Sequence, residues 1–306
     1  MAGHRKQGVR DYVVDGSREG QRLDTVLAAV WPDISRSSWV SLIKGQQILL
    51  DNAPAKPSQS VLFGSRIVVL SLPVPKHTEL VASQETPQTL FIDEDVIVIF
   101  KPAGLIVHPT VGSDEPSVVG SYREQIADPD QVRPGVVHRL DRDTSGVMVL
   151  ARTLEAKKFL QSAFRARKVK KTYWALVWGD PGIGVKRLAF GMSPAGGRAG
   201  VMRVDPLGKS AETIISTLSR GPEVSLVEAR PITGRTHQIR VHLTALGFPI
   251  LGDKIYGKSG DLVRRQMLHA RELSFVLPSG EHKTFEASVP ADFQSTMEQY
   301  SCRMPQ

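Results

Sequence analysis

The sequence contains very little cysteine, and this scarcity restricts how the chain can be stabilised. Cys302 is the only cysteine among the 306 residues. An intramolecular disulfide is therefore excluded, and a structural zinc site that needs several thiolates is disfavoured. A lone cysteine fits a reducing compartment, so we expect a cytoplasmic protein. A chain of this length can bury a large core without disulfides and has room for two domains.

Long apolar segments are missing as well. No apolar run approaches the roughly 20 residues that a membrane-spanning helix needs. The basic start, Met1–Lys6, is not followed by an apolar stretch, so we interpret it as a short tail rather than a secretory signal. The sequence shows no internal repeat and no low-complexity tract. We expect a protein without a membrane partner, and we expect it to act as a monomer.

Basic residues are in excess, with 39 Lys and Arg against 31 Asp and Glu. The formal net charge of +8 and the pI of about 9.6 favour a polyanionic partner, nucleic acid first and an anionic membrane second. Residues 152–171 carry eight Lys or Arg against one acid, Glu155. Runs of this kind are usually solvated faces, but beside a candidate active loop this one predicts a track for phosphates.

The first part of the chain predicts a small α+β domain. Residues 1–19 are interpreted as a tail and a first strand. Within residues 20–72, apolar side chains at helical spacing predict two helices, and short apolar runs bounded by turn residues predict strands. Ser35 is suited to cap the second helix. The proline-containing segment 73–89 has the composition of a linker.

Residues 90–306 predict one larger domain in which strands dominate. Two apolar runs around an acidic turn predict a strand pair over 90–100, and Thr236 is expected to cap a helix. Residues 179–210 are rich in glycine and proline and predict an irregular hairpin region. Because no regular βαβ alternation is present, the predicted fold class is α+β, with a mixed, largely antiparallel sheet and flanking helices.

A charged loop lies in the middle of this domain. His138–Gly146 is flanked by two apolar runs, Val136–Val137 and Val147–Leu150, which we interpret as buried strands. Loops held by a rigid sheet commonly carry catalytic residues. Asp141 has two arginines and a histidine within three residues, and nearby cations favour an ionised carboxylate. Asp141 is therefore a candidate nucleophile, although an aspartate among arginines is more often part of a loop ion pair.

The same loop resembles the signature of RluA/RluD-type RNA pseudouridine synthases. Further segments resemble that family in the same order, namely Lys101–Gly104, Lys171–Tyr173, Thr233–His242, Pro249–Asp253, Tyr256–Gly257 and Leu268–Ala270. The resemblance covers about residues 90–290. It implies that the chain isomerises uridine to pseudouridine in RNA, large-subunit rRNA in particular. It also implies an aspartate nucleophile, flipping of the target base and no cofactor.

The resemblance assigns roles to individual residues. Asp141 corresponds to the family nucleophile, and Arg240 to the arginine that keeps this aspartate ionised and oriented. Tyr173 corresponds to the tyrosine that stacks on the target base, and Arg139 to the arginine that enters the space left by the flipped uridine. Leu268 corresponds to an apolar residue of the uracil pocket. The alternatives are that Tyr173 packs in the core and that Arg240 lies on the surface.

Four other residues of the matched segments are expected to shape the cleft. Lys101 is predicted to form part of its wall on the substrate side, and His138 is predicted to orient the loop by hydrogen bonds. His237 and His242 are expected to orient loops in the same way. Their spacing of five does not place two ligands on one helix face, so no metal site is predicted.

Residues 20–72 resemble the αL RNA-binding domain first seen in a small-subunit ribosomal protein. The matching segments are Arg22–Asp24, Ser35–Ser37, Ile43–Gly45 and Gly64–Ile67. The resemblance implies that Arg22, Arg36 and Lys44 contact the RNA backbone, since phosphate binding needs only well-placed cations. The alternative is that these three residues are ordinary exposed charges.

Two other functions remain open from the sequence. Asp141, Asp143 and Ser145 have the spacing of a magnesium-dependent aspartate-nucleophile phosphatase, which would require a doubly wound α/β domain. A non-catalytic RNA-binding factor for ribosome assembly would use the same basic surface and would tolerate the loss of Asp141.

Overall fold

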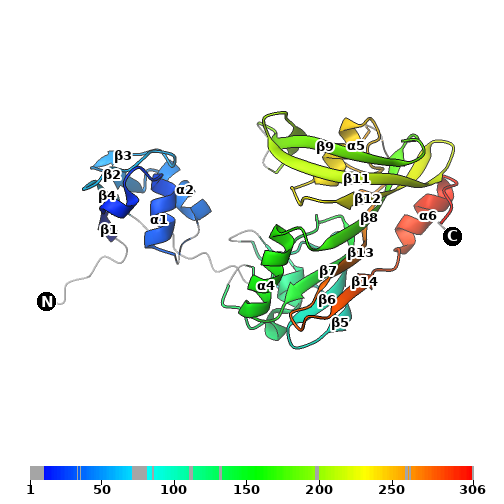
Figure 1. Cartoon of the computed structure of the whole chain (residues 1–306), viewed down its shortest axis with the longest axis horizontal. Helices are drawn as coiled ribbons and strands as arrows, with labels where there is room; N and C mark the ends of the chain where they lie inside the picture. The colour runs from blue at the N-terminus through cyan, green and yellow to red at the C-terminus, as the bar shows by residue number, and fades with distance from the viewer. Residues whose placement is uncertain are drawn as a thin grey trace. The chain divides into compact units, whose positions relative to one another are not determined.

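The chain forms two compact units, Met1–His77 and Thr78–Gln306 (Figure 1). The computed structural model describes residues 10–32, 34, 36–70, 81–84, 86–109, 113–130, 133–196, 200–258, 261 and 263–304. Ser35 and much of the segment interpreted as a linker lie outside these residues. None of the helices in the described ranges is both long enough and apolar enough to cross a membrane.

The smaller unit consists of two helices and a four-stranded antiparallel sheet with the strand order β1-β4-β2-β3. Leu23, Leu27, Trp39 and Ile43 from the two helices are completely or almost completely buried in its core. Its elements are β1 (Arg10–Val13), the short 3₁₀ helix η1 (Gly16–Arg18), α1 (Leu23–Val30), α2 (Arg36–Lys44), β2 (Ile48–Leu50), β3 (Ala53–Pro54) and β4 (Arg66–Val69).

The turn between β2 and β3 explains why this hairpin is tight. Leu50 pairs with Ala53, so only Asp51 and Asn52 connect the strands. Both have positive φ, at 52° and 66°. Two consecutive positive φ angles are typical of the type I′ turn, whose twist matches that of antiparallel strands. Asp and Asn tolerate this conformation better than most residues with a side chain.

The larger unit contains a ten-stranded sheet with the order β10-β9-β11-β12-β8-β13-β7-β6-β5, and β14 pairs with β13. All its ladders are antiparallel except that between β13 and β7. The strands are β5 (Gln88–Ile92), β6 (Val96–Lys101), β7 (Ser145–Ala151), β8 (Lys170–Trp178), β9 (Val185–Pro194), β10 (Met202–Val204), β11 (Lys209–Arg220), β12 (Val224–Pro231), β13 (Leu268–Val276) and β14 (His282–Glu286). The helices are α3 (Val118–Ser121), the 3₁₀ helix η2 (Arg123–Gln125), α4 (Leu154–Arg165), α5 (Gln238–Ala245) and α6 (Ala291–Gln299).

This topology confirms the predicted mixed, largely antiparallel α+β class. It contradicts the phosphatase alternative, because that reaction class was tied to a doubly wound sheet of parallel strands. Here the parallel pairing of β7 and β13 involves two residue pairs, His269 with Ser145 and Ala270 with Gly146. Gly146 has a φ of 123°, and a Cβ atom built there would lie 2.2 Å from the carbonyl oxygen of Ala270. Only glycine fits this close approach of two backbones.

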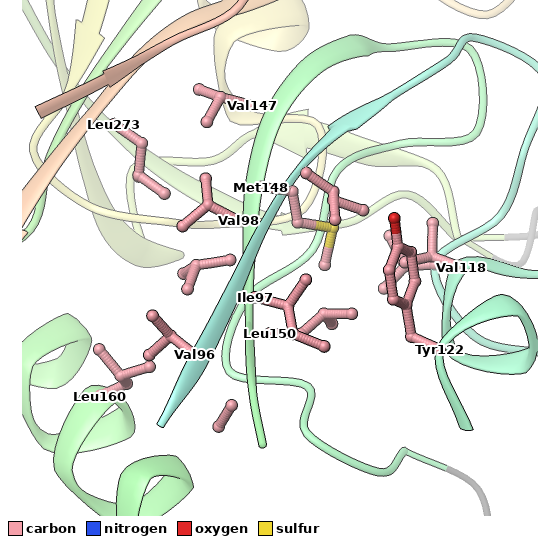
Figure 2. Close-up of a cluster of buried hydrophobic side chains, with 14 of the residues drawn as sticks. Val96, Ile97, Val98, Val118, Tyr122, Val147, Met148, Leu150, Leu160 and Leu273 are labelled. Atoms are coloured by element: carbon pink, nitrogen blue, oxygen red, sulfur yellow. The ribbon is translucent and has the colours of Figure 1, made fainter. Parts of the chain in front are cut away.

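Strand β7 supports the candidate loop, and it is buried on both faces. All seven of its residues are buried, as are Val96 to Ile99 of β6. Figure 2 shows Leu160 of α4 at one face of these strands and Val118 and Tyr122 at the other. A strand covered on both faces has an unbroken apolar sequence, which explains the run that ends at Leu150.

The expectation of a strand at Val136–Val137 is wrong. This segment makes only an isolated bridge, between Val136 and Leu150. It nevertheless follows the edge of β7, because the Ala151 amide donates to the Gly135 carbonyl. Two residues earlier in β7, the Val149 amide donates to Nε2 of His138 at 3.1 Å. An imidazole ring therefore replaces the next backbone acceptor, and the chain leaves the sheet at this point.

Residues 179–210 are more regular than expected. Instead of an irregular region, β9 is a ten-residue strand that pairs with β11 from Val185 to Met192. Gly191 lies within the strand, where the residue after β10 approaches it closely. A Cβ atom at Gly191 would lie 2.1 Å from the carbonyl oxygen of Asp205.

Helix α5 does not begin as predicted from Thr236. Its N-cap is His237, in the left-handed conformation with φ 55° and ψ 19° and without a side-chain capping bond. The side chain of Gln238 instead holds the turn that precedes the helix, because its Oε1 accepts the Arg235 amide and the Thr233 hydroxyl. Helix α6 was not predicted; it buries Phe293 and Met297 in the same core cluster as Leu243 of α5.

Candidate active site

Asp141 lies in the wall of a cavity of about 490 Å³, within the usual range for ligand sites. The cavity is formed by the loop before β7, the end of α4, the start of β8, the end of β12 and the start of α5. Its lining includes the predicted residues Asp141, Arg240, Tyr173, Arg139, His138 and Leu268, together with the basic residues Arg165, Arg167, Lys171 and Arg235. The structure therefore brings six of the seven site residues predicted in the larger domain to one cavity.

Asp141 and Arg240 form an ion pair in this wall. The Nη1 of Arg240 donates to Oδ2 of Asp141 at 2.9 Å. The Asp141 side chain is 19% exposed and that of Arg240 5% exposed. The other oxygen of Asp141, Oδ1, accepts no hydrogen bond from the described residues.

Arg240 binds a different carboxylate, that of Asp253, through two hydrogen bonds. Its Nε and Nη2 donate to Oδ2 and Oδ1 of Asp253 at 2.7 and 2.8 Å. Asp253 also accepts the amides of Ile255 and Tyr256, and this network holds its pKa below the usual range despite its burial. Arg240 thus has a buried anchor on one side and presents one N–H to Asp141 on the other.

Tyr173 and Leu268 come from adjacent strands and line the same cavity. Leu268 is 4% exposed, and Ala270, two residues along β13, pairs with Tyr173 of β8. Burial raises the pKa of Tyr173 well above its ordinary value, and the Asp141 carboxylate adds to this effect. Tyr173 is therefore a neutral phenol beside the carboxylate, which gives the cavity both a π-face and an apolar wall.

Lysine and arginine side chains line the side of the cavity reached by α4 and β8. Burial lowers the pKa of Lys171 to about 8, so this ammonium is still charged at neutral pH. Its Nζ donates to the carbonyl of Thr233 at 3.3 Å. Arg139 is exposed and is shared with a second cavity of about 630 Å³ on the other side of the loop, as is Asp141.

Lys101 does not lie in the cleft wall. Its side chain is completely buried, and its Nζ donates to the carbonyls of Pro102, Leu105 and Arg142 at 2.7 to 2.8 Å. Burial lowers the pKa of Lys101 to about 7, and the side chain has no exposed surface with which to contact RNA. The expectation that Lys101 faces the substrate is corrected to a role beneath the loop, where it fixes the carbonyl next to Asp141.

His138 also acts within the loop. Its ring stacks on Phe164 with centroids 4.7 Å apart, and its Nε2 accepts the Val149 amide. Burial and the nearby Lys171 lower its pKa to about 3, which keeps the ring neutral and able to accept. The hydrogen bond predicted to orient the loop is thus present.

The predicted RNA contacts of the smaller unit share one buried acid. Arg22 and Arg36 both donate to Asp24, whose side chain is 3% exposed, while the two arginine side chains are about half exposed. Lys44 is exposed at the end of α2. Arg22 and Arg36 are thus held in place by the ion pair and still present charge to solvent.

The described residues contain no group of three or more His, Cys, Asp or Glu side chains placed to hold a metal ion. His242 lies in the core against Phe190, completely buried, and neither of its ring nitrogens has a hydrogen-bond partner within the described structure. Two site residues were missed from the sequence, Asp253 and Tyr256. Both fall inside segments that resemble the family, and this was the only signal for them.

Comparisons with known proteins agree on one family. Residues 95–245 match the RNA pseudouridylate synthase family. An uncharacterized RNA pseudouridine synthase of Chloroflexus aurantiacus is 40% identical over 301 residues, 96% of this chain and 94% of that protein. Ribosomal large subunit pseudouridine synthase D of Neisseria meningitidis serogroup B is 38% identical over 288 residues, 89% of this chain and 77% of that protein.

A solved structure extends the agreement to the fold. Human RNA pseudouridylate synthase domain containing 4 is 29% identical, with a TM-score of 0.56, over 72% of this chain and 95% of that chain. The ordered motifs, the sheet topology and these relatives point the same way. The chain belongs to the RluA family of RNA pseudouridine synthases, isomerases that act on uridine in RNA.

Proposed function

We propose that this synthase modifies large-subunit rRNA and that Asp141 is its nucleophile. The assignment of Asp141 as the nucleophile is supported by its contact with Arg240, at the wall of a cavity that also contains Tyr173 and Leu268. The rRNA target is supported by relatives named ribosomal large subunit pseudouridine synthase D in Neisseria meningitidis and Pseudomonas aeruginosa, at 36 to 38% identity.

The reaction requires an ionised and directed nucleophile. The bond between N1 of uracil and C1′ of the sugar breaks, a bond between C5 and C1′ forms, and a hydrogen is lost from C5 while N1 gains one. Oδ1 of Asp141 is the attacking oxygen in this proposal, because Oδ2 is bound by Arg240. Attack on the ring and attack on the sugar are both compatible with this assignment. A covalent intermediate in either case divides one difficult step into two.

Arg240 orients Asp141 through the hydrogen bond from Nη1, and Asp253 keeps Arg240 in place. Tyr173 offers its ring to the flipped uracil, and Leu268 closes the apolar side of the pocket. Arg139, exposed between the two cavities, takes the space that the flipped uridine leaves in the RNA. A base taken out of its stack needs both a π-face and polar contacts in its new site, and this cavity supplies them.

We further propose the domain division made from the sequence, with an RNA-binding domain at 20–72, a linker at 73–89 and a catalytic domain at 90–306, except that β5 pairs with β6 from Gln88 and so assigns residues 88 and 89 to the catalytic domain. Arg22, Arg36 and Lys44 then bind phosphates of the RNA backbone. Support comes from the half-exposed guanidiniums of Arg22 and Arg36 and from the exposed Lys44. Replacing any one of these cations by a neutral residue should reduce the salt dependence of RNA binding, because fewer counterions are then released from the RNA.

The test is a map of pseudouridines in rRNA from cells that lack the gene. Wild-type protein should restore at least one missing pseudouridine in large-subunit rRNA, whereas Asp141→Asn should restore none. Full modification by Asp141→Asn would contradict the nucleophile assignment. A deletion strain with an unchanged large-subunit map would contradict the rRNA target. If Asp141→Asn corrected a ribosome-assembly defect without restoring modification, the protein would have a second, non-catalytic role.

A further inference from the structure

His237 occupies an unusual backbone position between the two cavities. Its φ of 55° lies in the left-handed region, which is costly for a residue with a Cβ atom. Its side chain is only 14% exposed and lines both cavities that meet at Asp141. Strained residues persist where the surroundings hold them in place, and they cluster at functional sites. The strained backbone therefore points to a functional role for the His237 ring.

The ring of His237 is fixed by Tyr256. The Nδ1 of His237 lies 2.8 Å from the Tyr256 hydroxyl oxygen, and that oxygen accepts the amide of Met202 at 2.8 Å. Burial raises the pKa of the Tyr256 hydroxyl, so it keeps its hydrogen. Among the described residues Nδ1 is the one acceptor within reach of the hydroxyl hydrogen, so this hydrogen is directed to Nδ1. Nδ1 is then the acceptor, and the imidazole hydrogen is on Nε2.

The protonated nitrogen faces the nucleophile. The Nε2 of His237 lies 3.9 Å from Oδ1 of Asp141, the oxygen that Arg240 leaves free. This distance is too long for a hydrogen bond. Burial lowers the pKa of His237, and the Asp141 carboxylate only partly opposes this, so the ring is a neutral donor at neutral pH. The N–H thus has no hydrogen-bond acceptor among the described residues and lies beside the reacting oxygen.

We propose that His237 is a catalytic hydrogen-bond donor to the uracil, and that Tyr256 is a positioning residue that fixes the required tautomer. The inference rests on the proposed role of Asp141. A carbon attacked by Oδ1 sits about 3 to 3.5 Å from it, which brings the ring atoms around that carbon within reach of Nε2. By either route of attack, negative charge develops on the uracil carbonyl oxygens as the N1–C1′ bond breaks.

A neutral imidazole N–H suits this task. It stabilises the charged oxygen by a hydrogen bond and keeps its own hydrogen, so the atom balance of the isomerisation is unchanged. An imidazolium would instead pair with Asp141 and weaken the nucleophile. Preorganised donors aimed at developing charge are among the largest contributors to catalysis, and removing one typically lowers kcat by about 10²–10³-fold.

Two substitutions of His237 separate the donor from the backbone conformation. Asn tolerates the left-handed region, but its amide is too short to reach the position of Nε2. Gln reaches further and supplies an N–H there. Single-turnover rates are measured as tritium released from uridine C5 of unmodified large-subunit rRNA. His237→Asn should lower the rate by about 100-fold, and His237→Gln should recover part of it, with RNA affinity unchanged in both.

Tyr256→Phe tests the tautomer. It keeps the aromatic ring, which lies 5.0 Å from the Arg240 guanidinium, and removes only the hydroxyl. Long-range proton–nitrogen NMR spectra of histidine-labelled protein should show wild-type His237 protonated on Nε2. In Tyr256→Phe the hydrogen should redistribute towards Nδ1, with a matching fall in the single-turnover rate. The matched control is Tyr300→Phe, because Tyr300 is a partly exposed tyrosine near the end of the chain.

The outcomes are distinct. Wild-type rates for folded His237→Asn, while Asp141→Asn is inactive, would overturn the inference and leave the proposed function intact. Unchanged spectra in Tyr256→Phe would overturn the tautomer lock. If wild-type protein released no tritium from large-subunit rRNA, the proposed target would be wrong. The NMR spectra would still test whether Tyr256 fixes the tautomer of His237. The role of His237 as a donor would then be tested on the RNA from which the wild-type protein does release tritium.

Discussion

Asp253 binds Arg240 through both carboxylate oxygens, and the two side chains are 1% and 5% exposed. A planar guanidinium held by two parallel hydrogen bonds cannot rotate freely. Of the three N–H groups left over, the one on Nη1 that donates to Asp141 therefore points in a fixed direction. The position of Asp141 is thus set, through Arg240, by a second carboxylate.

The first prediction concerns this anchor. Asp253→Asn should lower the free energy of unfolding by about 3 kcal/mol, because removing one partner of a buried pair leaves the other charge uncompensated. It should also lower kcat while RNA affinity stays close to that of wild type. Urea denaturation and single-turnover assays measure the two effects. Glu286→Gln, at an ion pair whose carboxylate is 56% exposed, is the control and should change stability by less than about 1 kcal/mol.

The second prediction concerns the geometry of Arg240 rather than its charge. Arg240→Lys keeps a positive charge but cannot donate to Asp253 twice and to Asp141 once from fixed directions. Turnover should fall much more than RNA binding, since the substitution leaves the exposed cations untouched. Filter binding and tritium release separate the two quantities. Equal reductions in affinity and turnover would contradict an orienting role.

The third prediction concerns the ammonium beneath the loop. Lys101→Met should leave the carbonyls of Pro102, Leu105 and Arg142 without their hydrogen-bond donor and reduce stability by about 3 kcal/mol. Exchange of the Gly104 amide hydrogen, which is bonded to the Arg142 carbonyl, should accelerate as the loop loosens. Lys44→Met, at an exposed lysine, is the control. Normal exchange at Gly104 in folded Lys101→Met would exclude this role.

The fourth prediction concerns acid stability. Burial lowers the pKa of His242 to about 4, whereas an unfolded histidine titrates near 6.5. Between these values the unfolded chain binds more protons than the folded chain, so stability is lost as the pH falls from 6.5 towards 4. Buried His269, with its pKa lowered to about 4, and His138, lowered to about 3, act in the same direction.

His242→Leu removes one of the groups that bind a proton in the unfolded chain but not in the folded chain. Its unfolding free energy should therefore fall less steeply over that window, by up to about 1.4 kcal/mol per pH unit. At pH 7.5 the variant should be as stable as wild type or more so, because neither ring nitrogen of His242 has a partner in the described structure. A slope identical to that of wild type would show that His242 titrates normally.

The residues at the cavity were predicted because they lie in long, ordered motifs. Asp141, Arg240, Tyr173 and Leu268 come from four segments, and nothing local relates them. Only the resemblance placed them in one site. Lys101 was misassigned for the same reason, since a motif position does not tell whether a side chain faces the substrate or supports the loop from below.

Other errors arose where tertiary structure overrides local pattern. Val136–Val137 is as apolar as a strand, but the ring of His138 takes the place of the next backbone acceptor. The glycines of residues 179–210 suggested irregular structure, yet Gly191 lies within a long strand, where the carbonyl of Asp205 after β10 leaves no room for a Cβ atom. Asp253 and Tyr256 drew no prediction because their importance depends on partners 13 and 19 residues away.

The parallel junction of β7 and β13 has a mechanical consequence. Leu140 packs in one hydrophobic core of the larger unit and Ile239 in a different one, so Asp141 and Arg240 are neighbours of residues from different cores. The two residue pairs of the junction, at Ser145 and Gly146, lie between these cores. A methyl group at Gly146 would push β7 and β13 apart. We expect this strand displacement to appear first as a longer distance between Asp141 and Arg240.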